Sequence, residues 1–189
     1  MNKRFLFSLI FIFLIIAVSG CINQQEEPKR LYNITQDGVE YIFLNNIYDT
    51  MNMTIEDSVN VNKTLYSPLK VIVAFNGSST EDNAYFSVVS YNLVEKLKNH
   101  YIYTRGILTE FEAINLEEKK PSVASTIIVL KGPNTGANST RIYYDNACIV
   151  DGVMISQYSR CVIIEGADYN GLVIASERLV LFLMDYETK

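Results

Sequence analysis

The chain has 189 residues and carries 16 Lys and Arg against 21 Asp and Glu, for a net charge of −5. Residues 1–20 hold two bases and no acid, so the remainder carries about −7. An acidic domain of this kind is a poor candidate for binding nucleic acid, because phosphates would be repelled. The 169 residues after position 20 are enough for one domain with a real core.

The chain begins with a hydrophobic leader. Lys3 and Arg4 precede an apolar run from Phe5 to Val18, which only Ser8 interrupts. The run is shorter than a full membrane span and has the length and basic start of a signal sequence. Small residues and Cys21 follow it directly.

Val18-Ser19-Gly20-Cys21 resembles the lipobox of prokaryotic lipoprotein precursors, in particular archaeal ones. The resemblance implies that residues 1–20 are removed and that Cys21 receives a lipid such as palmitate. It implies a cell-membrane location on the extracytoplasmic face. Two other interpretations stay open: an uncleaved signal anchor from Phe5 to Ile22, and an ordinary signal peptide with a coincidental cysteine.

The segment after Cys21 is polar and charged and contains Pro28. This composition is typical of a flexible tether. We therefore expect residues 21–36 to comprise the lipidated cysteine and tether, and residues 37–189 to form a single extracytoplasmic domain.

Two further cysteines, Cys148 and Cys161, form an even pair if Cys21 carries lipid. Outside the cytoplasm such a pair predicts a disulfide, and closing so short a loop is worth roughly 3 kcal/mol in the entropic model. The alternative is two buried free thiols that act as small hydrophobic side chains.

Five N-x-S/T sequons occur in the chain. In an exported protein each is a candidate N-glycosylation site. Their asparagines are Asn33, Asn52, Asn62, Asn76 and Asn138.

The first half of the domain alternates between strand and helix patterns. We predict strands over 39–44, 69–75 and 101–104, a helix over 81–99, and irregular structure over 45–62. The 69–75 run is continuously apolar, as in a strand buried on both faces. Phe86, Val89, Leu93 and Leu97 form one apolar helical stripe behind Ser79, a residue suited to capping a helix.

The second half continues the alternation. Thr109 to Glu112 has capping-box spacing, which predicts a short helix over 110–120. Further strands are expected over 126–130, 142–144, 148–150, 153–155 and 161–164, and Asp168 can cap a final helix near 168–184. The pattern predicts an α/β fold, a layered domain with a largely parallel sheet and helices near 81–99 and 168–184.

The loop after the 126–130 strand is a candidate ligand loop, with Gly132, Asn134, Thr135 and Gly136. Loops after parallel strands often hold ligands in α/β folds. It matches neither the Walker motif nor G-x-G-x-x-G, and the alternative is a plain turn.

No catalytic residue, metal site or cofactor is expected from the motifs. His100 is the only histidine, and we expect a surface or capping role for it. A less favoured reading brings Asp145, Asp151, Glu165 and Asp168 together to hold calcium. Four tyrosines near loops are a pointer to where a partner could bind, although core packing explains most tyrosines equally well: Tyr143, Tyr144, Tyr158 and Tyr169.

Val162 to Gly166, continuing into Ala175 to Leu179, resembles strand-loop-helix endings of archaeal S-layer and other surface proteins. This resemblance bears on location more than on function. The expected function is a lipid-anchored binding or envelope-structural module with no evident catalytic site. Its expected partners are the membrane through the lipid anchor, and envelope or S-layer proteins or glycans, but no nucleic acid. The alternative is an extracellular hydrolase with an acidic pair that no motif reveals.

Overall fold

The computed structural model describes residues 31–121, 125–150, 153–154 and 161–186. The leader and Cys21 fall within residues 1–30, outside the described residues. In chain order the elements are β1 (Tyr32–Gln36), β2 (Val39–Phe43), α2 (Ile47–Met51), α3 (Ser58–Leu65), β3 (Lys70–Phe75), α4 (Thr80–Lys98), the π-helix η1 (Asn99–Thr104), β4 (Glu110–Asn115), β5 (Thr126–Lys131), the 3-10 helix η2 (Pro133–Thr135), β6 (Arg141–Asp145), β7 (Ile149–Val150), β8 (Val153–Met154), β9 (Cys161–Glu165) and α5 (Tyr169–Leu183).

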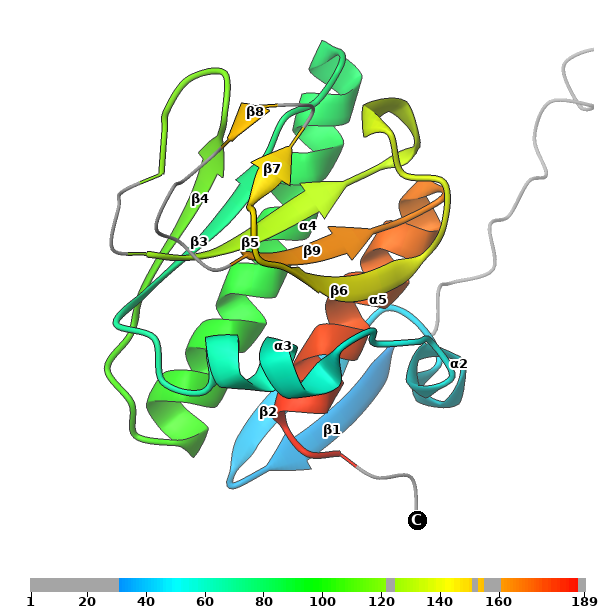
Figure 1. Cartoon of the computed structure of the whole chain (residues 1–189). Helices are drawn as coiled ribbons and strands as arrows, with labels where there is room; N and C mark the ends of the chain where they lie inside the picture. Colours follow the sequence, from blue (N-terminus) through cyan, green and yellow to red (C-terminus); the bar gives the residue numbers. More distant parts are fainter. Residues whose placement is uncertain (1–30, 122–124, 151–152, 155–160, 187–189) are drawn as a thin grey trace, which may run out of the picture. The chain divides into compact units, whose positions relative to one another are not determined.

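A five-stranded sheet in the order β4-β3-β5-β9-β6 forms the centre of the fold (Figure 1). Its first four strands are parallel, and β6 pairs antiparallel with β9. The apolar runs of β3, β5 and β9 are buried almost throughout, as expected for strands covered on both faces. The predicted α/β class with a largely parallel sheet is confirmed.

Both long helices, α4 and α5, pack on the same face of the sheet (Figure 1). The apolar stripe predicted for α4 is buried there, with Phe86, Leu93 and Leu97 at 1% exposure or less. Ser79 and Asp168 cap the two helices through their side chains, as predicted. No helix within the described ranges is long and apolar enough to cross a membrane.

A smaller apolar cluster lies on the opposite face of the sheet, where β7 crosses in front of the strands in Figure 1. Ile72, Ile127 and Ile163 point into this cluster, together with both cysteines. Among the described residues, this face is covered by the turn at Cys148 and by β7 rather than by a helix.

The domain starts earlier than predicted. β1 and β2 form a hairpin whose turn places Asp37 and Gly38 at positive φ, so residues 32–36 are a strand and not part of the tether. Tyr41 and Phe43 of the hairpin are buried in the main core. The buried carboxylate of Glu177 on α5 accepts hydrogen bonds from the backbone N–H groups of Leu44 and Asn45.

Three of the predicted elements were wrong. Residues 45–62 contain α2 and α3, because Val61 and Leu65 bury one side of α3 in the core. Residues 101–104 continue α4 as a π-helix instead of forming a strand. Residues 110–120 begin with β4, since the Thr109 hydroxyl donates to the Pro68 carbonyl instead of capping a helix, and the segment pairs with β3.

Candidate functional site

The carboxyl ends of β3, β5 and β9 meet at one edge of the sheet, and α4, η2 and α5 begin there (Figure 1). In α/β folds this edge is where ligands usually bind, because the loops after the strands are free to vary there. Its polar side chains come from three segments that lie far apart in the sequence.

Four side chains form what we call the carboxyl-edge cluster: Ser78, Asp82, Asn134 and Tyr169. Asp82, in the first turn of α4, is only 1% exposed. The Ser78 hydroxyl donates to one of its carboxylate oxygens, and the Tyr169 hydroxyl donates to the other. The Asn134 amide donates to that second oxygen at 3.0 Å, so the loop after β5 is bonded to both helix starts.

These hydrogen bonds fix the charge of Asp82. The donors Ser78 and Tyr169 lower the pKa of Asp82 to about 2, and outweigh the opposite effect of burial. The same contact raises the pKa of Tyr169. Asp82 is therefore a permanent negative charge at neutral pH. It is poorly suited to act as a general acid or base, which would need a pKa near the working pH.

Contacts between Tyr85 and Tyr169 also hold the starts of α4 and α5 together. The Tyr85 hydroxyl of α4 donates to the Tyr169 carbonyl at 2.5 Å, and the two rings lie 4.2 Å apart. Burial, with Asp168 nearby, raises the pKa of Tyr85 to about 12. The segments at this edge are therefore held together by side-chain contacts and are not separate loops.

The predicted ligand loop lies at this edge, but some of its side chains have structural roles. Thr135 accepts a hydrogen bond from the Gly132 N–H at 2.8 Å and closes the η2 turn. Gly136 has a φ of 87°, which favours glycine. Asn134 is exposed and reaches Asp82 and Tyr169. Replacing Asn134 or Thr135 would thus disturb the fold as well as any binding.

Sequence reasoning did not bring Ser78, Asp82 and Tyr169 together. In the sequence Tyr169 is recognisable only as a loop tyrosine, and no motif marks Ser78 or Asp82 as a site residue. The sequence does show that Ser78, Asp82 and Tyr169 each lie within seven residues of the end of a buried strand. Which strands are neighbours depends on the sheet order, and no local pattern shows that order.

The acidic residues considered for calcium have separate partners. Glu165 accepts from Arg141 at 2.9 Å and from the Tyr143 hydroxyl at 2.8 Å. Asp168 caps α5, and Asp145 accepts the backbone N–H groups of Ala147 and Ile149. Asp151 lies outside the described residues. Across the ranges that the structure describes, no three carboxylates, cysteines or histidines gather in a metal-binding arrangement.

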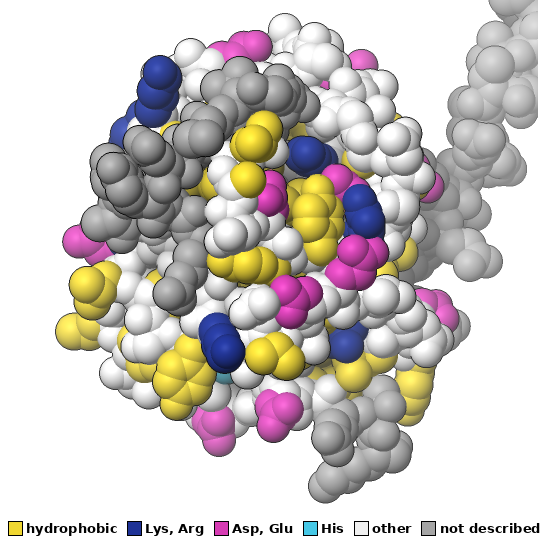
Figure 2. Space-filling model, in the orientation of Figure 1, with side chains coloured by type: hydrophobic (Ala, Val, Ile, Leu, Met, Phe, Trp, Pro, Cys, Tyr) yellow, Lys and Arg dark blue, Asp and Glu magenta, His cyan; other side chains and the backbone are white. Residues whose placement is uncertain are grey.

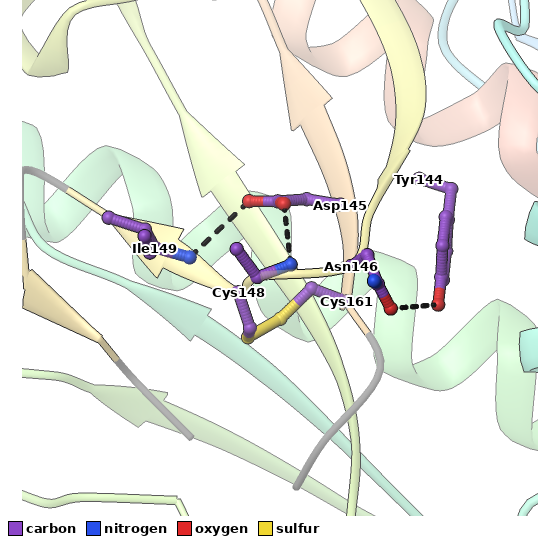
Figure 3. Close-up of a disulfide and its surroundings, with 7 residues drawn as sticks. Tyr144, Asp145, Asn146, Cys148, Ile149 and Cys161 are labelled. Atoms are coloured by element: carbon purple, nitrogen blue, oxygen red, sulfur yellow. Dashed lines mark hydrogen bonds between the residues drawn. A yellow bond between two sulfur atoms is a disulfide. The ribbon is translucent and has the colours of Figure 1, made fainter. Parts of the chain in front are cut away.

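Cys148 and Cys161 form a disulfide with their Cα atoms 5.3 Å apart, as the pairing argument predicted (Figure 3). Both are fully buried, and Cys148 takes a positive φ. Figure 3 shows the Asp145 carboxylate bonded to the turn that leads into β7. The bridge ties this turn to the start of β9, over the smaller apolar cluster.

His100 is buried, and not on the surface as predicted. It is 3% exposed, and neither ring nitrogen has a hydrogen-bond partner among the described residues. Burial, and secondarily the charge of Arg105, lowers the pKa of His100 to about 4. It is therefore a neutral core side chain at neutral pH.

The sequons differ in accessibility. The asparagines at four of them are exposed: Asn33, Asn52, Asn62 and Asn138. Asn76 follows β3, is only partly exposed, and its amide oxygen is buried. The Ser78 hydroxyl of that sequon is bonded to Asp82.

The predicted loop tyrosines differ in the contacts that their side chains make. Tyr143 stacks with the Arg141 guanidinium at 4.6 Å, and Tyr144 packs against the main core. Tyr158 lies outside the described residues. Only Tyr169 joins the carboxyl-edge cluster.

In comparisons with known proteins, no family model matches this chain, and no curated protein matches it in sequence.

Proposed function

We propose that this chain is a lipid-anchored binding module on the extracytoplasmic face of the cell membrane, held by Cys21. The leader order of bases, apolar run, small residues and cysteine supports the location. The observation that carries the proposal is the Cys148–Cys161 disulfide, because disulfides persist mainly outside the cytoplasm and this one leaves Cys21 as the unpaired cysteine.

The binding face of this proposal is the edge that holds the carboxyl-edge cluster. Its accessible groups include the neutral side chains of Ser78, Thr80 and Asn134 and the exposed carboxylate of Glu81, all near the fixed charge of Asp82. Such donors and acceptors suit hydroxyl-rich glycans or the polar surface of an envelope or S-layer protein. These are the proposed partners, beside the membrane itself.

A binding role is better supported than the alternative of a hydrolase. Hydrolysis by an acidic pair needs one carboxyl group with a raised pKa. Asp82 has a lowered pKa, and the carboxylate of Glu165 is paired with Arg141. These two acids therefore fit a structural or recognition role, and a third at this end, Asp168, is bonded to the start of α5 as its cap.

Metabolic labelling with a radioactive lipid precursor tests the anchor. We expect label in the wild-type chain and none in Cys21→Ala. The matched control is the double variant Cys148→Ala, Cys161→Ala, which keeps Cys21 and should keep the label. Equal labelling of the wild type and Cys21→Ala would contradict the lipid attachment.

A photo-crosslinking residue placed in intact cells tests the binding edge. Thr80 is exposed beside the carboxyl-edge cluster, and Val59 is 63% exposed on α3 as a matched control position. We expect an adduct with one envelope protein or glycan from position 80 that is at least several-fold stronger than any from position 59. Equal adducts from the two positions would contradict this choice of face.

A further inference from the structure

Four large apolar side chains are exposed at the opposite, amino-terminal edge of the sheet. Leu69 and Leu108 are each 84% exposed, and Tyr66 and Tyr103 are more than 60% exposed. We call these four residues the amino-edge surface. Single exposed apolar residues need no explanation, but a group of four on two neighbouring segments indicates an interaction surface.

The two loops that carry this surface are bonded together. Arg105 donates to the Tyr66 carbonyl at 2.7 Å, and its guanidinium lies 4.7 Å from the centre of the Tyr66 ring. The Glu110 N–H donates to the Leu69 carbonyl at 3.0 Å. The segments that carry Leu69 and Leu108 are therefore held in place relative to each other, just before β3 and β4 begin.

Local charge at this edge is opposite to that of the chain. Segments 57–72 and 95–110 contain five Lys and Arg against three Asp and Glu, a local excess of positive charge in a chain that carries −5 overall. Two acids of β4 lie beside this surface and pair with Lys70, Glu110 at 3.8 Å and Glu112 at 3.0 Å, which leaves Lys63 and Arg105 as cations outside that pairing. In Figure 2, hydrophobic side chains gather at the lower left, over the loops that lead into β3 and β4.

This combination matches the chemistry of a bilayer surface. Tyrosine is enriched at the level of lipid headgroups, leucine inserts below them, and Arg and Lys are attracted to anionic lipids. Residues 22–31 can span at most about 35 Å, whereas a domain of this size is about 40 Å across. A chain held at Cys21 thus keeps its domain against the membrane, within reach of this surface.

We infer that the amino-edge surface rests on the bilayer that holds the lipid anchor, with Leu69 and Leu108 entering the headgroup region. The inference depends on the lipid anchoring proposed above. In this orientation the carboxyl-edge cluster, at the other end of the parallel strands, faces away from the membrane and towards the envelope.

A fluorescent probe on the full chain in vesicles tests this orientation. The chain is reconstituted into phosphatidylcholine vesicles with one quarter phosphatidylglycerol, after labelling Leu108→Cys with an environment-sensitive dye. Val88→Cys, 61% exposed on α4, is the matched control. We expect the dye at 108 to shift to the blue, and spin-labelled lipid to quench it at least twice as strongly as the dye at 88.

A second variant and a separate readout keep the outcomes distinct. Adding Leu69→Gln, which changes an exposed side chain, should weaken the quenching at 108. Flotation of the chain with the vesicles reports on the anchor, and a chain that fails to float contradicts the proposed function. A floating chain whose dye at 108 is unquenched, or is blue-shifted without quenching because protein covers it, overturns the membrane-facing surface alone.

Discussion

His100 makes the stability of this domain depend on pH. The side chain is 3% exposed, and burial lowers its pKa from 6.5 to about 4 in the folded state. The unfolded chain binds the proton first, so stability is complete above pH 6.5 and is lost as the pH falls from 6.5 towards 4. The loss attributable to His100 is on the order of 3 kcal/mol at most.

Urea unfolding at pH 7.5 and pH 4.5 measures this loss. The carboxylates also titrate in this range, so the comparison is made between the wild type and His100→Phe. We expect the variant to lose clearly less stability on acidification than the wild type does. Identical losses in the two proteins would show that His100 is not responsible.

Asn76 should remain unmodified even if other sequons carry glycans. N-glycosylation attaches sugar to the asparagine amide and produces a bulky surface group. The Asn76 amide oxygen is buried, and the hydroxyl of Ser78 is bonded to Asp82. Glycopeptide mapping of the protein from its own cells should find glycans only among Asn33, Asn52, Asn62 and Asn138. A glycan on Asn76 would contradict the described geometry of this turn.

At the scale of elements, the sequence predicts those whose signals are local. The strands β3, β5 and β9 have continuous apolar runs, and α4 and α5 have both a stripe and a capping residue. The wrong predictions concern segments where distant contacts decide. β4 exists because β3 offers it a partner, and α3 exists because the core accepts Val61 and Leu65.

Glu177 is the link between α5 and the N-terminal hairpin. Its carboxylate is 3% exposed and accepts from the Leu44 N–H at 2.6 Å and from the side-chain amide of Asn45 at 2.9 Å. Because Gln keeps only one acceptor oxygen and no charge, it cannot accept at all three contacts, and Glu177→Gln should lower the free energy of unfolding by about 2 kcal/mol. Urea denaturation measures the change.

Glu118→Gln is the control for this prediction, since Glu118 is exposed. It should change stability by less than about 0.5 kcal/mol. Hydrogen exchange should also show faster exchange of the β1 and β2 amides in Glu177→Gln. A Glu177→Gln protein as stable as Glu118→Gln would mean that the link contributes nothing.

At the scale of the whole molecule, the candidate site was predictable only in part. The loop at 132–136 follows a strand, so its place at the carboxyl edge could be predicted from local pattern. Its contacts with Asp82 and Tyr169 could not, because they depend on β9 lying beside β5. The disulfide was predictable from cysteine counting, since only one intramolecular pair remains once Cys21 is assigned to lipid.

The two ends of the sheet have different chemistry, and this division organises the whole molecule. The carboxyl edge presents polar side chains and the acids Glu81 and Asp82, and the amino edge presents Leu69, Leu108 and Arg105. We propose that one end meets the envelope and the other meets the bilayer. Both assignments depend on Cys21 being the point of attachment.

The intact mass of the chain purified from membranes tests that attachment most directly. We expect a chain that begins at Cys21, lacks residues 1–20, carries the added mass of lipid on Cys21, and contains no free thiol. A chain that keeps residues 1–20, or one that begins at Cys21 with no added lipid, would contradict it.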